Sequence, residues 1–461
     1  MIRSLPLPVL YHMIRRIIVT ILKFALRVYF RRIEVVGLDN VPRDAPVIFV
    51  LNHPNALVDP VFLLCLAPRR VSFVAKATLF RMPIISYLVR ALDSLPAYRR
   101  QDEGQDISRN LETFAAARRL LARGGTIGIC PEGVSHNEPR LKPLKTGAAR
   151  IALGAVSSGD ALDLQIVPVG LYYTEKTTFR SSALLYFGEP LPVAPCVLEP
   201  DGTPPRAAVH ELSDRVENAL RDVILHAEQE EALSLIERAE RIFSAAEVGE
   251  PDAEQLLTRS LQLRQRFVEG YAYYRSRAPK RIDAIEARIA RFEFELKEAG
   301  IDPDDLSLPP TAAHTILRLV AQIMTCAFLA PIALLGTVIH YPAYRLGGFL
   351  SLQLARREQD VLSTFKIISA MLLFPLTWIV VALVSWRFAG WPVAVASLIL
   401  SPASGFIAIR FFEKIEEFAG SFLALALFVM RRRSFLRLLA ERAAIRREIL
   451  ALGDEAALRI T

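Results

Sequence analysis

Short apolar runs alternate with helical patterns between residues 47 and 188. Four runs that each end in a loop-forming stretch predict buried strands: Val47–Leu51, Val71–Ala75, Thr126–Cys130 and Gln165–Tyr173. Two segments with helical periodicity lie among them: Ile107–Arg123, which is followed by two glycines, and Gly147–Val156. This alternation favours an α/β domain with a mixed, mostly parallel sheet that is flanked by helices.

A separate helical segment is expected ahead of this domain, over residues 1–33. Between Tyr11 and Tyr29, bases recur among Ile, Leu, Val and Phe, so a helix there has an apolar face and a cationic edge. Such a helix suits the surface of an anionic membrane, and a surface helix of a soluble protein is the alternative. The bases also interrupt the apolar runs, so the segment does not predict a signal peptide.

The composition changes twice more along the chain. A Pro-rich stretch ends the α/β domain, to which we assign residues 34–205, and residues 206–308 predict two or three charged, solvated helices without evident chemistry. Residues 309–410 contain three uncharged apolar segments, at about 319–339, 367–384 and 391–409. Each is long enough to cross a hydrocarbon core of about 30 Å, and buried helices of a soluble protein are the alternative. A basic helical tail is expected over 411–461.

The distribution of basic residues leaves the number of membrane crossings open. If all three apolar segments cross, the loop Tyr341–Lys366 and the basic tail lie on the face opposite the α/β domain. If Leu319–Ile339, which contains Pro331, is re-entrant or interfacial, Ile367–Ile409 forms a hairpin. That arrangement suits a domain that faces the cytoplasm, which is the orientation we expect.

The net charge and hydropathy indicate the class of binding partner, and the spacing of the cysteines indicates their role. The 461-residue chain has a formal net charge of +8 and a mean hydropathy of +0.30. With this hydrophobicity, an anionic membrane or a phosphate-bearing substrate is favoured over nucleic acid, for which no motif is present. The four cysteines lie far apart and show no CxxC pairing, which indicates small buried residues. No metal site and no particular oligomeric state are predicted.

The first candidate site lies where the strand Val47–Leu51 runs into a loop. His53 is followed by Asp59, with five residues between them. A neutral histidine can take a proton from an attacking hydroxyl, and a nearby carboxylate fixes its tautomer and stabilises the imidazolium. Because Asp59 precedes Pro60, it is also typical of a helix cap. The two roles are compatible, since a carboxylate has two oxygens.

A second candidate, Glu132, follows the strand Thr126–Cys130 in a tight loop. The loop places its side chain at the same edge of the sheet as His53. Glu132 could orient a substrate hydroxyl or hold the loop by accepting hydrogen bonds from backbone N–H groups, and an exposed turn glutamate is the alternative. Arg99 and Arg100 are candidates for phosphate binding, because a guanidinium binds phosphate through two parallel hydrogen bonds.

Four blocks therefore occur in order: Asn52-His53 to Asp59, Tyr98-Arg99-Arg100, Pro131-Glu132-Gly133 and Val167-Pro168-Val169. They resemble the four motifs of the glycerol-phosphate and lysophosphatidate acyltransferase superfamily, over roughly residues 34–192. The loop between His53 and Asp59 is one residue longer than usual, and Val134-Ser135-His136 stands in place of Thr-Arg-Ser. Both features resemble the branch typified by fungal glycerol-3-phosphate and dihydroxyacetone-phosphate acyltransferases, which carries a long C-terminal extension with membrane segments.

The resemblance implies a membrane-bound O-acyltransferase. It would transfer a fatty acyl group from acyl-CoA or acyl carrier protein to glycerol 3-phosphate or lysophosphatidate, with a slight preference for the former and with no further cofactor. It implies catalytic roles for three residues, His53, Asp59 and Glu132, and substrate binding by six: Asn52, Arg99, Arg100, Gly133, Ser135 and Lys145. The arginine that usually follows the Glu-Gly pair is missing, so Arg99, Arg100, Lys142 or Lys145 must supply its charge.

The expected mechanism is direct transfer without an acyl-enzyme. His53 takes the acceptor's hydroxyl proton, Asp59 steadies His53, and backbone donors near Glu132 and Gly133 stabilise the oxyanion. Two other functions stay open. One is a catalytically silent membrane scaffold with the charged helices as its working surface, and the other is a hydrolase that uses the same base on water.

Overall fold

The computed structural model describes residues 7–460 except 83–84, 100–106, 137, 139, 162, 226–234, 236–237, 239–255, 300–311, 357 and 431. The chain divides into two compact units, which are described separately. The first comprises residues 1–226 together with 357–364, and the second comprises residues 227–356 and 365–461.

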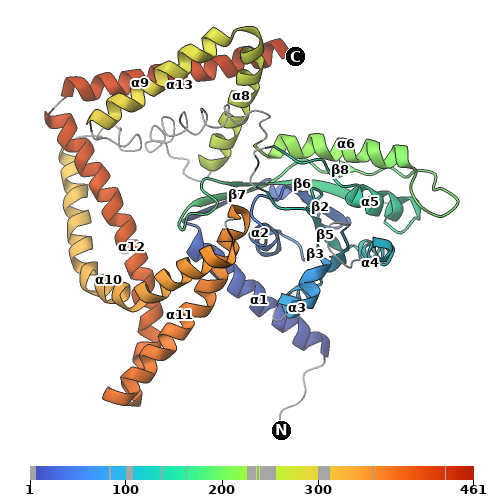
Figure 1. Ribbon diagram of the computed structural model, residues 1–461, viewed down its shortest axis with the longest axis horizontal. Coiled ribbons are helices and arrows are strands. Elements are labelled where there is room, and N and C mark those ends of the chain that lie inside the picture. The colour runs from blue at the N-terminus through green and yellow to red at the C-terminus, as the bar shows by residue number, and fades with distance from the viewer. Residues whose placement is uncertain are drawn as a thin grey trace. The chain divides into compact units, whose positions relative to one another are not determined.

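The first unit contains an eight-stranded sheet (Figure 1). Its strands are β1 (Arg32–Val36), β2 (Val47–Leu51), β3 (Val71–Lys76), β4 (Leu95–Ala97), β5 (Thr126–Ile129), β6 (Gln165–Tyr173), β7 (Ser182–Phe187) and β8 (Leu191–Pro192). The order is β1-β7-β6-β2-β5-β3-β4, with β8 paired to β6. Every pair is parallel except β6 with β7 and β6 with β8. The expected mixed, mostly parallel sheet is confirmed.

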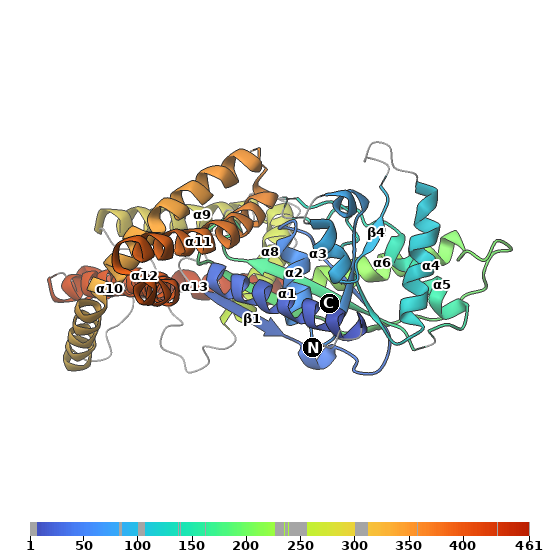
Figure 2. The same ribbon diagram turned by 90° about the horizontal axis from the view of Figure 1, so that it is seen from below.

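Helices cover both faces of the sheet (Figures 1 and 2). They are α1 (Leu7–Tyr29), α2 (Val58–Leu66), α3 (Ile85–Ala91), α4 (Asn110–Leu121), α5 (Gly147–Ser157) and α6 (Arg206–Val223). Alternate residues of β2 point to opposite faces. Ile48 and Val50 share one core with α4, α5 and α6, whereas on the other side Phe62 of α2 packs on Phe30 and Tyr173. With all five residues of β2 buried, the loop after it is anchored between two cores.

The N-terminal helix is longer than its expected core and has an apolar face. Five large side chains on it are exposed: Met13, Ile14, Ile17, Ile21 and Phe24. The cationic edge is only partly available to lipid, because Arg15 is buried and donates a hydrogen bond to the carbonyl of Val71 (2.9 Å).

The sheet unit continues past the boundary expected at residue 205, because α6 packs on β6. Gly170 allows this close approach: a Cβ built on it would lie 1.8 Å from the Val223 carbonyl oxygen. We therefore expect Gly170→Ala to lower the free energy of unfolding by about 3 kcal/mol, measured by thermal unfolding in detergent. Gly147→Ala is the control, since nothing lies within 4 Å of a Cβ added there. Equal unfolding midpoints for the two variants would contradict this packing.

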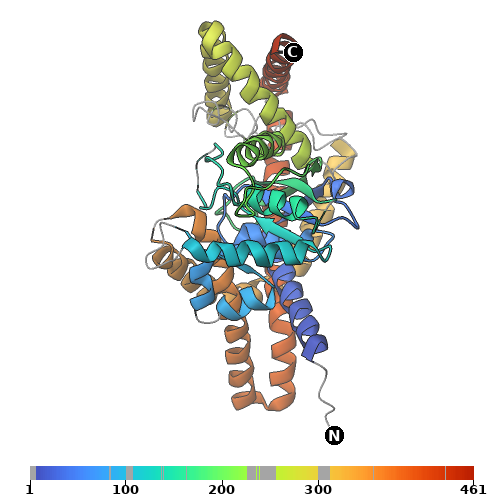
Figure 3. The ribbon, with the colours of Figure 1, turned by 90° about the vertical axis from the view of Figure 1, so that its right-hand side faces the viewer.

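The second unit is helical: α8 (Leu256–Arg277), α9 (Pro279–Ala299), α10 (Ala312–Leu354), α11 from residue 365 (Gln359–Ala389 overall), α12 (Trp391–Met430) and α13 (Arg432–Ile460). The charged helices were expected to be solvated on all sides, but α8 and α9 share a core with the tail helix α13 (Figures 1 and 3). Tyr271, Phe292 and Phe435 are buried in that core. Arg288 of α9 also forms ion pairs with Glu441 and Glu448 of α13.

Three helices of the described chain are long and apolar enough to cross a membrane: Val320–Leu354, Gln359–Ala389 and Trp391–Glu416. They carry most of the large exposed hydrophobic side chains, which indicates membrane association. The expected three apolar helices are confirmed. Pro331 does not interrupt the first of them, because α10 runs continuously through it. Small residues allow α10 and α12 to pack closely, as a Cβ on Gly336 would lie 2.2 Å from the Ser404 carbonyl oxygen.

Candidate active site

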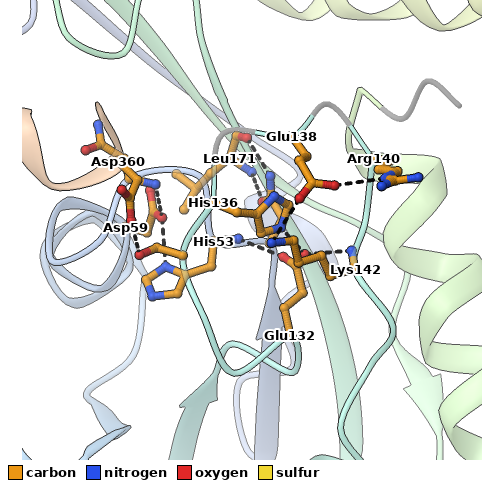
Figure 4. A network of polar contacts seen from close by, with 12 residues as sticks. His53, Asp59, Glu132, His136, Glu138, Arg140, Lys142, Leu171 and Asp360 are labelled. Carbon is orange, nitrogen blue, oxygen red and sulfur yellow. Dashed lines mark hydrogen bonds and ion pairs between the residues drawn. The ribbon is translucent and has the colours of Figure 1, made fainter. Parts of the chain in front are cut away.

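The structure brings His53 and Asp59 into contact just beyond the end of β2 (Figure 4). His53 Nδ1 lies 2.9 Å from Asp59 Oδ2, and the Asp59 side chain is fully buried. Two further groups donate to the same carboxylate: the Asn55 N–H to Oδ2 (2.7 Å) and the Tyr173 hydroxyl to Oδ1 (2.6 Å). Three donors thus fix the carboxylate, which in turn fixes the orientation of the His53 ring.

The helix-cap alternative for Asp59 is not what the structure shows. Helix α2 begins at Val58, its cap residue is Leu57, and the cap makes no side-chain hydrogen bond. Asp59 lies in the first turn, where its oxygens are used by the loop and by β6. The long loop between His53 and Asp59 is accommodated by a turn in which Ala56 has a φ of 31° and the Asn55 carbonyl accepts from the Val58 N–H (2.9 Å).

The pKa of His53 is raised well above its ordinary value. Burial alone lowers it, but the negative Asp59 carboxylate, which accepts a hydrogen bond from the ring, favours the charged form and outweighs burial. Burial raises the pKa of the Cys130 thiol, which stays protonated. Burial and the neighbouring Asp59 carboxylate likewise raise the pKa of Tyr173, so its hydroxyl remains a donor.

Glu132 is a buried residue that holds the active-site loops together (Figure 4). Its Oε1 accepts from the His53 N–H (3.1 Å), and its Oε2 accepts from the Lys142 N–H (2.9 Å). The His136 ring contacts Oε2 as well. These contacts match the loop-holding role that was one of the two alternatives and exclude an exposed turn glutamate.

Asn52 makes two side-chain hydrogen bonds to the backbone of β6. Its Nδ2 donates to the Leu171 carbonyl (2.9 Å) and its Oδ1 accepts from the Leu171 N–H (2.8 Å). Both ends of the amide are thus used to link the end of β2 to β6. The structure gives Asn52 a structural role, because parallel β2 and β6 leave these backbone groups next to it, and its role in substrate binding stays a prediction.

The remaining predicted residues gather around the loop after Glu132. Gly133 has a φ of 74°, a left-handed conformation that suits glycine. Arg99 donates to the Gly133 carbonyl, and the Lys145 side chain passes close to Gly133. Ser135 donates to the Asp360 carboxylate. Arg100 lies outside the described residues. The second and third sequence blocks therefore meet at one loop, next to His53.

Four residues at or near the site were missed by the sequence analysis. Tyr173 and Asn55 bind Asp59, Cys130 touches His53, and Asp360 reaches Ser135 from a distant part of the chain. The parallel strands did contain a signal for Tyr173 and Cys130, since both lie at strand ends on the same edge as His53. Among the described residues, no cluster of three or more His, Cys, Asp or Glu side chains could hold a metal ion.

Comparison with known proteins matches two family models to the chain. The Acyltransferase family model matches residues 32–172, and that of the Glycerol-3-phosphate acyltransferase 2 C-terminal domain matches residues 248–457. Together they include strands β1 to β5, most of β6, the loops with His53 and Glu132, and most of the helical region. The acyltransferase structure of Thermotoga maritima, a 1-acyl-sn-glycerophosphate acyltransferase, is 20% identical and covers 45% of this chain and 79% of its own. Its TM-score of 0.33 is too low to support an argument.

Two yeast proteins are similar over longer stretches. Glycerol-3-phosphate O-acyltransferase 2 of Saccharomyces cerevisiae is 28% identical over 59% of this chain and 37% of its own length. Glycerol-3-phosphate O-acyltransferase 1 of the same yeast is 26% identical over 76% of this chain and 58% of its own length. The chain thus spans only part of these relatives. The chain has an Acyltransferase domain followed by a Glycerol-3-phosphate acyltransferase 2 C-terminal domain, and its similarity to the yeast proteins supports the branch of the fungal glycerol-3-phosphate acyltransferases.

Proposed function

We propose that this protein is a membrane-bound O-acyltransferase that transfers a fatty acyl group from an acyl thioester to glycerol 3-phosphate, with lysophosphatidate as the alternative acceptor. The observation that carries this proposal is the buried Asp59 carboxylate held against His53 Nδ1 (2.9 Å). It makes Nδ1 the protonated nitrogen and leaves Nε2 as the base. The names of the yeast relatives favour glycerol 3-phosphate as the acceptor.

The chemistry follows from that tautomer. The acceptor's hydroxyl oxygen attacks the thioester carbonyl while His53 Nε2 takes the hydroxyl proton. Collapse of the tetrahedral intermediate breaks the carbon–sulfur bond, and the imidazolium returns the proton to the leaving thiolate. The Gly133 N–H already donates to the Cys130 carbonyl (3.1 Å), so other donors around this loop must bind the oxyanion.

Positive charge for the acceptor's phosphate is available beside the same loop. Arg99 and Lys145 both lie against Gly133, at the position where the arginine that usually follows the Glu-Gly pair is missing. A guanidinium and an ammonium there can bind a phosphate while its glycerol hydroxyl points to His53. Acyl-CoA and acyl carrier protein both offer the thioester that the scheme needs.

Cys130 provides a test of direct transfer against a covalent acyl-enzyme. Its thiol touches His53, but burial raises its pKa, and a protonated thiol is a poor nucleophile. We therefore expect Cys130→Ala to keep kcat within about threefold of the wild-type value. Steady-state transfer assays measure the effect, and trapping of a labelled acyl-enzyme with acid is the complementary readout. A large loss of kcat with a trapped acyl group on the wild-type protein would replace direct transfer by a two-step mechanism.

For the topology, the contacts of residues 358–364 favour the hairpin. This segment lies in the compact unit of the acyltransferase domain, so the start of α11 and that domain share one membrane face. If α11 crosses and α12 returns, α10 stays on the same face, which we propose is the cytoplasmic one. Cysteines introduced at Glu358 and at the exposed Asp160 of the acyltransferase domain test this in sealed vesicles. The hairpin predicts labelling of both from the same side, and three crossings predict labelling from opposite sides.

The function is tested with membranes that contain the protein and labelled palmitoyl-CoA, offered glycerol 3-phosphate, lysophosphatidate or no acceptor. We expect product with glycerol 3-phosphate. Product only with lysophosphatidate would reassign the acceptor. Label released as free fatty acid without an acceptor would indicate the hydrolase. No turnover with either acyl-CoA or acyl carrier protein, in a well-folded preparation, would favour the scaffold.

A further inference from the structure

The start of α11 reaches the candidate active site from outside the acyltransferase domain. Residues 357–364 belong to the same compact unit as the sheet, although more than a hundred residues separate them from α6. In this segment Asp360 is half-buried and Ser363 is fully buried. Both side chains make hydrogen bonds to the acyltransferase domain.

Asp360 binds the loop that lies against the catalytic histidine. Its carboxylate accepts a hydrogen bond from the Ser135 hydroxyl. The next residue, His136, donates its backbone N–H to the His53 carbonyl (3.2 Å) and packs its ring on Glu132. Asp360 is therefore linked to the backbone of His53 through two neighbouring residues. Figure 4 shows Asp360 on the side of the network where His53 and Asp59 lie.

Ser363 binds the loop after β6, which lies on the Asp59 side of the His53–Asp59 pair. Its hydroxyl donates to the Lys176 carbonyl and accepts from the Tyr29 hydroxyl (3.2 Å). The same Lys176 carbonyl accepts from Asn55 Nδ2 (3.4 Å), and the Asn55 N–H binds Asp59. One helical turn thus contacts the loops after β5 and β6, and each of these loops binds the segment that carries His53 and Asp59.

The charges in this region also couple Asp360 to the site. Burial lowers the pKa of Lys176, while Asp59 and Asp360 both act to raise it. The ammonium therefore lies in the field of both carboxylates. Removal of Asp360 takes away one of the two negative charges that face this half-buried cation.

We propose that Asp360 is a positioning residue for the acyl transfer, which acts by holding the Ser135–His136 loop against His53. This inference rests on the proposed function. It also implies that the active site is incomplete without the first turn of α11. A charged acceptor makes a strong hydrogen bond. Loss of the Ser135–Asp360 contact should therefore disturb the alignment of His53 and lower kcat, with a smaller effect on the binding of either substrate.

Asp360→Ala in the full chain is expected to lower kcat about 10- to 100-fold, with both KM values within about threefold of wild type. Asp360→Asn keeps an acceptor oxygen and should recover most of the activity. Glu358→Ala is the matched control, because Glu358 is an exposed carboxylate two residues away, outside the contacts above. Ser135→Ala should make the Asp360→Ala substitution nearly silent, since the two side chains act through one hydrogen bond.

A second measurement keeps the proposal independent of turnover. Amide exchange of the His136 N–H, measured by hydrogen–deuterium exchange, should rise about tenfold in Asp360→Ala and not in Glu358→Ala. Unchanged exchange and unchanged kcat would overturn the proposal. A lower unfolding temperature with unchanged kcat would also overturn it, because it would show that Asp360 only stabilises the start of α11. If the wild-type protein acylates no acceptor, the proposed function fails, and exchange at His136 alone decides whether Asp360 holds the loop.

Discussion

Replacement of His53 by alanine is expected to lower kcat for acyl transfer by about 10³-fold or more. Three neighbouring side chains are otherwise engaged: burial favours the protonated Cys130 thiol, both oxygens of Glu132 accept backbone hydrogen bonds, and the His136 ring contacts Glu132. Without the imidazole, the acceptor hydroxyl must lose its proton to water, and the leaving thiolate must depart without an acid.

The measurement compares acceptor-dependent transfer by wild-type and variant protein in matched membranes, at saturating acyl donor. His210→Ala is the control, because His210 is an exposed histidine on α6, in the same compact unit. The two variants should unfold at similar temperatures, so that the loss can be ascribed to chemistry. A His53→Ala protein with more than about a tenth of wild-type kcat would refute the assignment of the base.

The sequence predicted the part of the site that parallel strands determine. The strand ends of β2 and β5 neighbour one another, so the loops with His53 and Glu132 had to meet at one edge. Each predicted strand was also mostly apolar, which is typical of strands buried on both faces. For the same reason the strand β1 was missed, because it lies at one edge of the sheet and has Arg32 and Glu34 among its five residues.

The side-chain partners could not be predicted in the same way. Asn52 precedes the histidine of a recognisable motif, yet its amide pairs with the Leu171 backbone, a contact set by the register of β2 and β6. Asp360 follows a long apolar helix, where a carboxylate is typical of a helix start. Its contact with Ser135 depends on how the chain returns to the sheet, which no local pattern contains.

Asp59→Asn is expected to lower kcat about 10³- to 10⁴-fold, although the substitution changes the side-chain volume little. The carboxylate accepts from His53, Asn55 and Tyr173. An amide has one acceptor oxygen and an NH₂ group. Its single oxygen cannot accept hydrogen bonds from the Asn55 N–H, the Tyr173 hydroxyl and His53 Nδ1 while all three donors stay in their present places. If the NH₂ group faces His53, Nδ1 becomes the acceptor and the proton moves to Nε2, which then cannot act as the base.

The pH dependence of kcat/KM separates this effect from a loss of structure. In the wild type, kcat/KM should rise with pH through the raised pKa of His53, since only the neutral ring takes the proton. In Asp59→Asn, burial still lowers that pKa, but the carboxylate that opposed burial is gone. The midpoint of the residual activity should therefore move to lower pH while its maximum falls. Tyr173→Phe, which removes one donor and keeps the His53–Asp59 pair, should cost about tenfold or less. An Asp59→Asn profile with the wild-type midpoint would show that Asp59 does not set the protonation of His53.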